Sequence, residues 1–341
     1  MRTVTGQQAQ NQVDIEAIER STAPLDTTEQ ASPAGQDRAA AIEISNLVVN
    51  YGAHRAVDGL TMTVPQGSIF GFLGPNGAGK TTTIKALLGL RPLDGGSVRV
   101  LGYDAAKASL EVRARVGYVP EVNSLYDYLT IPQICAFCRA TSRQWNQQVV
   151  DRYIGVFGLP AEAKVGRLSK GMKSQLALSL ALGSSPDLLI LDEPTAGLDP
   201  VARHEFLNKL VAEIAAEGKT IFFSSHILSE VEAVADWVGI IRRGKLVVSD
   251  ELDHLKQTQK VLKLTYAELP PPAALQELRS LPTVMSLAQE GRSVRLLTHG
   301  DVQALTQTIQ ARPYALRDVD TVDLNLEDLF LEYMKENSDG R

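Results

Sequence analysis

The sequence predicts an α/β fold: a parallel sheet with a glycine-rich loop after one of its strands, followed by a smaller α+β unit. From residue 41 to about residue 250, strand-like segments alternate with helix-like segments, which is typical of a parallel sheet covered on both faces. The apolar segment Ser68–Leu73 runs directly into the glycine-rich loop, and a helix is expected to begin near Lys80. Past Asp250 the pattern changes to short strands and helices, with a stiff break at Pro270–Pro272.

Composition defines the class of protein. With 341 residues, of which 44% are hydrophobic and 22% charged, the chain can bury the cores of one large and one small domain. The net charge of −6 argues against broad capture of nucleic acid, which needs a basic surface. We find no signal-peptide pattern and no run of the roughly 20 apolar residues that span a bilayer. We therefore expect a cytoplasmic chain that acts on membranes only through a partner.

The expected elements divide the chain into three regions. Strand-like composition marks the segments Ile42–Val49, Leu60–Val64, Ser68–Leu73, Ser97–Leu101, Arg115–Val119, Leu188–Leu191, Thr220–Phe223 and Val238–Ile241. Later strands are expected at Val261–Tyr266, Val284–Ala288, Val294–Leu297 and Tyr314–Asp318, and helices near Ala273–Leu281, Asp301–Ala311 and Leu326–Met334. We expect a disordered leader over residues 1–40, a domain over 41–250 with a helical subdomain at about 122–182, and an accessory domain over 251–341.

The glycine-rich loop fits the pattern G-x-x-x-x-G-K-[ST]. It consists of Gly74, Pro75, Asn76, Gly77, Ala78, Gly79, Lys80 and Thr81, and Thr82 continues into the helix. The glycines let backbone N–H groups converge on phosphate oxygens, and the positive end of the following helix points at the same place. Lys80 would reach the β- and γ-phosphates, while the Thr81 hydroxyl would bind Mg²⁺. The loop predicts an ATP site.

A second motif, Asp187–Pro194, is an apolar strand that ends in two carboxylates. Ligands of open α/β sheets bind at this edge. Asp192 suits the Mg²⁺ shell, and Glu193 suits a general base that orients the attacking water. Because neighbouring strand residues point to opposite faces, the alternative is a solvated strand end.

Between these motifs lies a segment that resembles the signature of ABC-type ATPases. It keeps Leu168, Ser169 and Gly171, whereas Lys170 and Met172 depart from the usual Leu-Ser-Gly-Gly-Gln. The resemblance implies a P-loop (RecA-like) core with an antiparallel β subdomain and a helical subdomain. In this family the signature of one subunit completes the nucleotide site of the other. The resemblance therefore implies a dimer of two identical copies, with a heterodimer as the alternative.

Other residues follow in the order of the family. Tyr51 matches the aromatic that stacks on adenine, although a buried aromatic at a strand end is the alternative. Asp199, in Ala196–Asp199, matches the loop that meets the partner subunit, and His226 matches the switch histidine that contacts the γ-phosphate. Glu121 stands where the family carries a glutamine that touches Mg²⁺, and its carboxylate can also offer an oxygen to the metal.

The resemblance points to the ATP-hydrolysing subunit of a membrane exporter. Glu121 and the segment Leu324–Glu332 resemble the ABC-2 type of exporter. Such a subunit docks a separate permease at the cytoplasmic face of the plasma membrane, and we expect Tyr126–Ala140 to form the docking surface. One alternative is a soluble ABC ATPase that acts on ribosomes or nucleic acid, but such proteins usually carry two ATPase units or a coiled-coil insertion. A module that binds ATP without turnover is the other, and the intact set of Lys80, Asp192, Glu193 and His226 argues against it.

Overall fold

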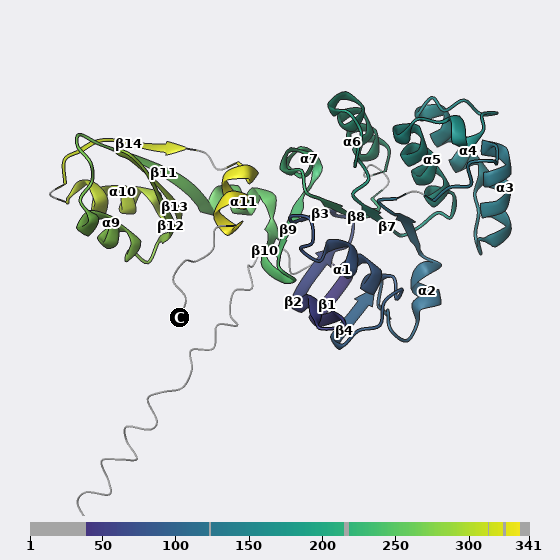
Figure 1. Ribbon diagram of the computed structural model, residues 1–341, viewed down its shortest axis with the longest axis horizontal. Coiled ribbons are helices and arrows are strands. Elements are labelled where there is room, and N and C mark those ends of the chain that lie inside the picture. The colour runs from purple at the N-terminus through teal and green to yellow at the C-terminus, as the bar shows by residue number, and fades with distance from the viewer. Residues whose placement is uncertain (1–38, 123, 215–217, 313, 323–324, 335–341) are drawn as a thin grey trace, which may run out of the picture. The chain divides into compact units, whose positions relative to one another are not determined.

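The computed structural model describes residues 39–322 and 325–334, apart from residues 123, 215–217 and 313 (Figure 1). The expected leader, residues 1–40, thus lies outside the described residues except for its last two. The described residues form three sheets with helices packed against them, which confirms the predicted mixed α/β class.

The central sheet has six strands in the order β10-β9-β3-β8-β7-β6. Its parallel strands are β3 (Ile69–Leu73), β6 (Val116–Val119), β7 (Leu188–Asp192), β8 (Thr220–Ser225) and β9 (Trp237–Arg242), and β10 (Lys245–Glu251) runs antiparallel at the edge. Every residue of β3, β7 and β8 is buried, as expected of parallel strands covered on both faces. Leu73 pairs with Ser225, and Asp192 pairs with Ser224. The register therefore brings the carboxyl ends of β3, β7 and β8 to one edge.

A second sheet, antiparallel and in the order β2-β1-β4-β5, covers the first helix. It contains β1 (Ala40–Tyr51), β2 (His54–Pro65), β4 (Gly95–Val100) and β5 (Tyr103–Asp104), and α1 spans Lys80–Leu87. Ile84 and Leu87 of α1 are fully buried in one cluster with residues of both sheets. Figure 1 shows α1 beside β1, β2 and β4. The helix that follows the phosphate loop is thereby held from two sides.

Residues 122–182 contain the helices that the sequence predicts. They are α3 (Ile131–Thr141), α4 (Gln147–Val156), the short 3-10 helix η1 (Val165–Arg167) and α5 (Lys170–Gly183). Thr130 and Gln133 form a reciprocal capping box at the start of α3, and Asn146 caps α4. Tyr153, which is 1% exposed, anchors the core between α4 and α5. A short helix, α2 (Ser109–Arg113), precedes β6.

The accessory region has the element order β-α-β-β-α-β. Its strands β11 (Gln259–Tyr266), β12 (Val284–Glu290), β13 (Ser293–His299) and β14 (Leu316–Val322) form an antiparallel sheet in the order β12-β13-β11-β14, with α9 (Pro272–Arg279) and α10 (Val302–Gln310). This is the ferredoxin-like topology. The strand expected at Tyr314–Asp318 lies at 316–322 instead. This edge strand has polar residues at exposed positions, here Asp318 and Asp320. The pattern of apolar residues from which a strand is predicted is therefore weak.

Three further helices pack near the central sheet: α6 (Pro200–Ile214), α7 (Leu228–Val234) and α8 (Leu252–Thr258). A domain boundary after Asp250 stays a prediction. Just beyond that residue, Leu252 and Leu255 of α8 lie in the same hydrophobic cluster as α7. The composition of β10 and α8 was too polar for either element to be predicted.

The last described helix, α11 (Leu326–Met334), packs on α7 as well as on the accessory sheet. Leu326 and Leu329 are fully buried in the cluster that contains Val231 of α7 and Val261 of β11. The backbone N–H of Leu326 donates to Glu232 of α7 at 3.4 Å. The spacing of Leu326, Leu329, Phe330 and Tyr333 predicts an amphipathic helix that packs on the small domain. The structure adds the contact with α7, and the Tyr333 side chain lies outside the described part of the chain.

Replacing Leu329 with alanine should test this contact. Deleting a fully buried leucine side chain leaves a cavity, so we expect Leu329→Ala to lower the free energy of unfolding by about 3 kcal/mol. Leu331, on the same helix, is 54% exposed, and Leu331→Ala should cost less than about 0.5 kcal/mol. Urea unfolding of both variants gives the comparison. Equal losses in the two variants would contradict the packing described for α11.

Candidate active site

The phosphate loop connects β3 to α1 at the carboxyl edge of the central sheet. Gly79 precedes α1 with φ 111°, and a Cβ there would lie 2.6 Å from the carbonyl oxygen of Ala56. A Cβ at Gly74 would lie 2.5 Å from the carbonyl oxygen of Ile241. Both positions therefore require glycine, for conformation and for close approach of two backbones. Pro75, Asn76 and Gly77 are exposed, while Gly74 and residues 78–80 are buried, so the outer part of the loop faces solvent.

Lys80 is buried and sits between the loop and the second motif. Its Nζ donates to the carbonyl oxygen of Gly74 at 2.7 Å and lies 2.9 Å from Glu193 Oε1, and the side chain is 6% exposed. Thr81 follows in the first turn of α1, where its hydroxyl forms a hydrogen bond with Asp192. Thr82 is half-buried beside it. The phosphate loop and the two carboxylates thus form one site.

Asp192 and Glu193 face the same site, although they are neighbours in sequence. Asp192 is the last residue of β7, and Glu193 leaves the strand with φ 47°, a left-handed conformation that is uncommon outside glycine. This turn brings both side chains toward Lys80. They are 1% and 7% exposed, which excludes the alternative of a solvated strand end.

Ser224 of β8 connects the two acids. Its hydroxyl donates to Asp192 Oδ1 at 2.7 Å and accepts the backbone N–H of Glu193 at 3.0 Å. Burial raises the pKa of Asp192, and the nearby Glu193 carboxylate acts in the same direction, while hydrogen bonds from Ser224 and Thr81 and the charge of Lys80 oppose them. Sequence reasoning missed Ser224. The two serines before His226, at the end of an apolar strand, were the available signal.

His226 follows the end of β8 and joins the cluster formed by Lys80, Asp192 and Glu193. Its Nδ1 lies 2.7 Å from Glu193 Oε2, and because an ionised carboxylate only accepts, Nδ1 is the donor. The imidazole is 42% exposed, whereas the carboxylate is buried. Glu193 Oε1 faces the ammonium group of Lys80, whose Nζ is 2.9 Å away. Glu193 therefore has one oxygen held by the histidine and one held by the lysine.

Tyr51 lies at the end of β1 and is 43% exposed. The guanidinium carbon of Arg91 is 4.3 Å from the centroid of its ring, an arrangement typical of a cation–π contact. Arg91 also donates to the carbonyl oxygen of Asn50 at 2.5 Å. The structure excludes the alternative of a buried strand-end aromatic. An exposed ring held by an arginine can stack on a planar ligand.

The signature segment (Leu168–Met172) begins α5. Leu168 is buried, Ser169 and Lys170 are exposed, and the Ser169 hydroxyl caps the helix by accepting the N–H of Met172 at 3.2 Å. No hydrogen bond or ion pair joins residues 168–172 to residues 74–82 in the described part of the chain. The structure therefore does not bring the signature segment to its own phosphate loop.

The signature segment instead lies against the 196–199 loop, which follows the catalytic acids. A Cβ at Gly197 would lie 2.2 Å from Lys170 Nζ, and one at Gly171 would lie 3.0 Å from a methyl group of Leu198. Asp199 is exposed and caps α6, since its Oδ1 accepts the N–H groups of Val201 and Ala202 at 3.0 Å each. The sequence did not predict this capping role.

Glu121 follows β6 and is exposed. It makes no hydrogen bond to Thr81 or Asp192 among the residues that the structure places. Its charge does reach the neighbouring Tyr118: burial raises the pKa of Tyr118 to about 12, and the charges of Asp192 and Glu121 contribute. Glu121 thus lies near the carboxylate cluster without touching it.

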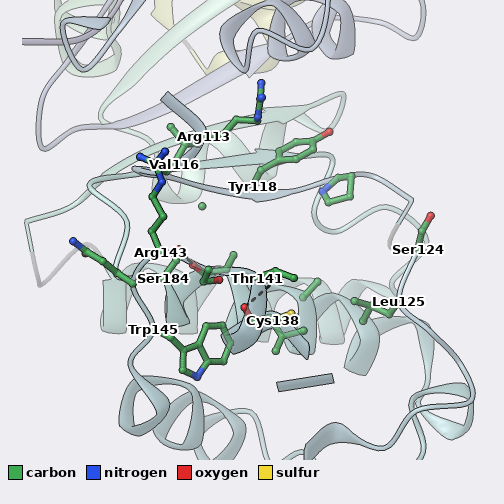
Figure 2. A pocket seen from close by; sticks show the side chains of 18 of the residues that line it. Arg113, Val116, Tyr118, Ser124, Leu125, Cys138, Thr141, Arg143, Trp145 and Ser184 are labelled. Carbon is green, nitrogen blue, oxygen red and sulfur yellow. Dashed lines mark hydrogen bonds between the residues drawn. The ribbon is translucent and has the colours of Figure 1, made fainter. Parts of the chain in front are cut away.

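An open cavity of about 720 Å³ adjoins the Glu121 segment. Figure 2 shows Arg113, Val116 and Tyr118 on one wall, and Leu125, Cys138 and Trp145 on the other. Pro120 and Val122, on either side of Glu121, also line it. The cavity separates the edge of the central sheet from α3 and α5.

The chain was compared with known proteins. The family model described as ABC transporter matches residues 57–196, which include the phosphate loop, the signature segment and both acids but not Tyr51, Asp199 or His226. The bacitracin transport ATP-binding protein BcrA of Bacillus licheniformis is 42% identical over 222 residues, covering 64% of this chain and 72% of that protein. The Nod factor export ATP-binding protein I of Burkholderia orbicola is 36% identical over 298 residues, covering 86% and 96%. The chain belongs to the ABC transporter ATP-binding proteins.

Solved structures agree with this assignment. An ATP-binding subunit of an ABC transporter superposes with a TM-score of 0.57 at 30% identity, covering 63% of this chain and 92% of that chain. A bacterial Atm1-family ABC exporter with ATP bound gives a TM-score of 0.55 at 25% identity, covering 63% and 40%. Proteins of this family hydrolyse ATP to power transport, and the chain is an ATP hydrolase of this kind.

The raised pKa of Asp192 has a consequence for stability. Its burial destabilises the fold above the raised pKa, and this penalty is relieved as the pH falls through that value. Asp192→Asn removes the charge while keeping the shape, so at pH 7.5 the melting temperature without nucleotide should rise, on the order of 2 °C. The variant should also lose most of the stabilisation given by ATP with Mg²⁺. Asp320→Asn, at an exposed position of β14, is the control for scanning fluorimetry. A lower melting temperature in nucleotide-free Asp192→Asn would contradict this reading.

Proposed function

We propose that Glu193 is the general base of ATP hydrolysis, with His226 and Lys80 as its catalytic partners. The supporting observation is that the two oxygens of the Glu193 carboxylate have different partners. His226 holds Oε2 at 2.7 Å, and the buried Oε1 faces Lys80 Nζ at 2.9 Å, a contact that is released if Lys80 turns to phosphate. Such an acceptor suits the proton of an attacking water. Lys80 is positioned to exchange its contact with Glu193 for phosphate oxygens when ATP binds.

ATP binding would involve Tyr51 for the base and residues 74–82 for the phosphates. Mg²⁺ in nucleotide sites takes one or two protein oxygens and completes its shell with phosphate oxygens and water. Thr81 and Asp192 fit that requirement, because both offer an oxygen and the Thr81 hydroxyl acts on the pKa of Asp192. Glu121 can supply a further oxygen. Bound there, the ion would neutralise phosphate charge and lower the raised pKa of Asp192.

Dimerisation would complete the site. The signature segment and the 196–199 loop lie together on this chain, and neither bonds to its own phosphate loop in the described residues. Ser169 and Lys170 are exposed at a helix N-terminus, where an anion is favoured. A second copy would place these groups against the phosphates of this chain, and a different ATPase subunit is the alternative partner.

The transport role would be that of an ABC-2 type exporter. The relatives named for bacitracin transport and Nod factor export support it, and similarity to the Nod factor protein covers 86% of this chain, more than the ATPase domain alone. Within the described residues no helix is long and apolar enough to cross a bilayer. We place the chain at the cytoplasmic face of the plasma membrane, attached to a separate permease.

The permease would dock on the cavity beside Glu121 and on an adjacent aromatic patch (Tyr126, Tyr128 and Phe137). These three side chains are 45%, 71% and 48% exposed. Tyr126 packs on both of the others, with ring centroids 5.8 and 5.6 Å apart. An exposed cluster of aromatic residues is typical of a protein interface. Its position supports the docking surface that the sequence predicts at Tyr126–Ala140.

Glu193→Gln tests the catalytic proposal. Without a carboxylate, the variant should lose turnover by about 100-fold or more while retaining ATP binding. Because bound ATP would persist, the protein should accumulate as a dimer. Single-turnover hydrolysis and light scattering with ATP and Mg²⁺ measure the two effects. Undiminished turnover would remove Glu193 as the base, and a monomer saturated with ATP would contradict the dimer.

Tyr128→Glu tests the docking surface. The charge should reduce stimulation of ATPase activity by the permease about 10-fold, because burying it at an interface is costly, while basal activity stays unchanged. Leu269→Glu, at a residue of the accessory domain that is 68% exposed, is the matched control. The assay uses proteoliposomes that contain a candidate permease with several spanning helices. Normal stimulation of Tyr128→Glu would exclude the patch as the docking site.

A further inference from the structure

A buried carboxylate outside the catalytic cluster joins the segments on which that cluster lies. Glu230 belongs to α7 and is 3% exposed. Its Oε1 accepts a hydrogen bond from Thr195 Oγ1 at 2.7 Å and lies 3.0 Å from Arg203 Nε. Its Oε2 accepts a hydrogen bond from Ser225 Oγ at 2.7 Å. Both oxygens therefore accept a hydrogen bond, and an arginine from a third segment lies at ion-pair distance.

Both hydrogen-bond donors lie next to the proposed catalytic residues. Thr195 follows Glu193 by two positions, in the turn that begins with the left-handed conformation of Glu193. Ser225 immediately precedes His226, and its hydroxyl also accepts the N–H of the residue after the histidine, at 2.9 Å. Glu230 thus holds Thr195, which lies close to Glu193 in the chain, and Ser225, which precedes His226.

The ion-pair partner extends the connection to the 196–199 loop. The guanidinium of Arg203 donates to the carbonyl oxygen of Leu198 at 3.1 Å. Leu198 in turn lies against Gly171 of the signature segment, where an added Cβ would be 3.0 Å away. Arg203 thereby links the carboxylate of Glu230 to the 196–199 loop, which we assign to the interface with the partner subunit.

Packing alone does not explain a charge at this position. A buried ion pair seldom stabilises a fold more than an apolar residue of similar volume would. A carboxylate does something that an apolar residue cannot: it accepts several hydrogen bonds at once, in defined directions. Its two hydrogen-bond donors and its ion-pair partner Arg203 are each linked to a loop that carries proposed catalytic residues or faces the proposed partner subunit. The arrangement suits a residue that fixes the positions of these loops relative to one another.

We propose that Glu230 is a positioning residue for ATP hydrolysis, which holds the segments of Glu193 and His226 in register with each other and with the 196–199 loop. The proposal rests on the catalytic roles proposed above for Glu193 and His226. Glu230 itself contacts neither residue through a recorded bond, so it acts through Thr195, Ser225 and Arg203. Displacement of a catalytic group by about 1 Å can reduce a rate 100-fold.

Glu230→Gln in the full-length protein tests the proposal. The amide keeps the size of the side chain but has one acceptor oxygen and no charge. We expect kcat to fall about 10- to 100-fold while KM for ATP changes less than about 2-fold, since the ATP-binding residues are not displaced. Glu232→Gln is the matched control. Glu232 lies on the same helix but pairs with Lys256 of α8 at 2.9 Å, and its variant should keep the wild-type kcat.

A double variant separates positioning from a general loss of structure. If Glu230 acts by placing the Glu193–His226 pair, Glu230→Gln should have little further effect on kcat once His226→Ala has broken that pair. Multiplicative losses in the double variant would overturn the proposal, as would an unchanged kcat in folded Glu230→Gln. Should Glu230→Gln fail to fold, Thr195→Val tests the proposal instead. This variant removes one hydrogen bond to Glu230 while the carboxylate keeps its other partners, and we expect an approximately 3- to 10-fold loss of kcat. An unchanged kcat in that variant would also overturn the proposal.

Glu193→Gln, assayed in parallel, keeps the two proposals distinguishable. If Glu193→Gln is inactive and Glu230→Gln is fully active, the positioning role fails and the assignment of the base stands. If Glu193→Gln turns over ATP normally, the assignment of the base fails, and any loss in Glu230→Gln has another cause.

Discussion

The burial of two adjacent carboxylates, Asp192 and Glu193, is the constraint on which the rest of the site depends. Taking one carboxylate out of water costs several kcal/mol unless partners compensate, and here two lie at the end of one strand. Compensation comes from Lys80 of α1, from Ser224 of β8 and from His226 beyond it. The acids are tolerable only if these elements converge, and Glu193 leaves the strand in a left-handed backbone conformation beside Asp192.

The parallel sheet supplies that convergence. Its register places the carboxyl ends of β3, β7 and β8 at one edge, so the phosphate loop, the two acids and the histidine emerge together. Gly74 and Gly79 allow the loop to approach neighbouring backbones closely, and the antiparallel sheet and the central sheet hold α1 between them. The cation of Lys80 is therefore held beside the buried carboxylate of Glu193.

The helix α7 has a central place in this architecture. Glu230 connects it to the loops of the central sheet, while Glu232 bonds to Lys256 and to the first residue of α11. The accessory sheet reaches the same helix through the buried leucines of α11. The ferredoxin-like region and the catalytic edge thus share one short helix. A displacement of the accessory sheet or of the central-sheet loops would therefore act on contacts of the same helix, α7.

Local motifs account for what the sequence by itself determined: the phosphate loop, the pair Asp192 and Glu193, the signature segment and the α/β class. Strand–loop–helix geometry fixes the spacing of such motifs, so residue types along the chain are sufficient to recognise them. Tertiary structure decided the rest: the strand at 316–322, the edge strand β10, the helix α8 and the packing of α11 on α7. Polar edge strands and short helices give weak periodicity, and their packing depends on partners far away in sequence. The same holds for Ser224 and Glu230, because a hydrogen-bonding side chain is defined by what surrounds it in space.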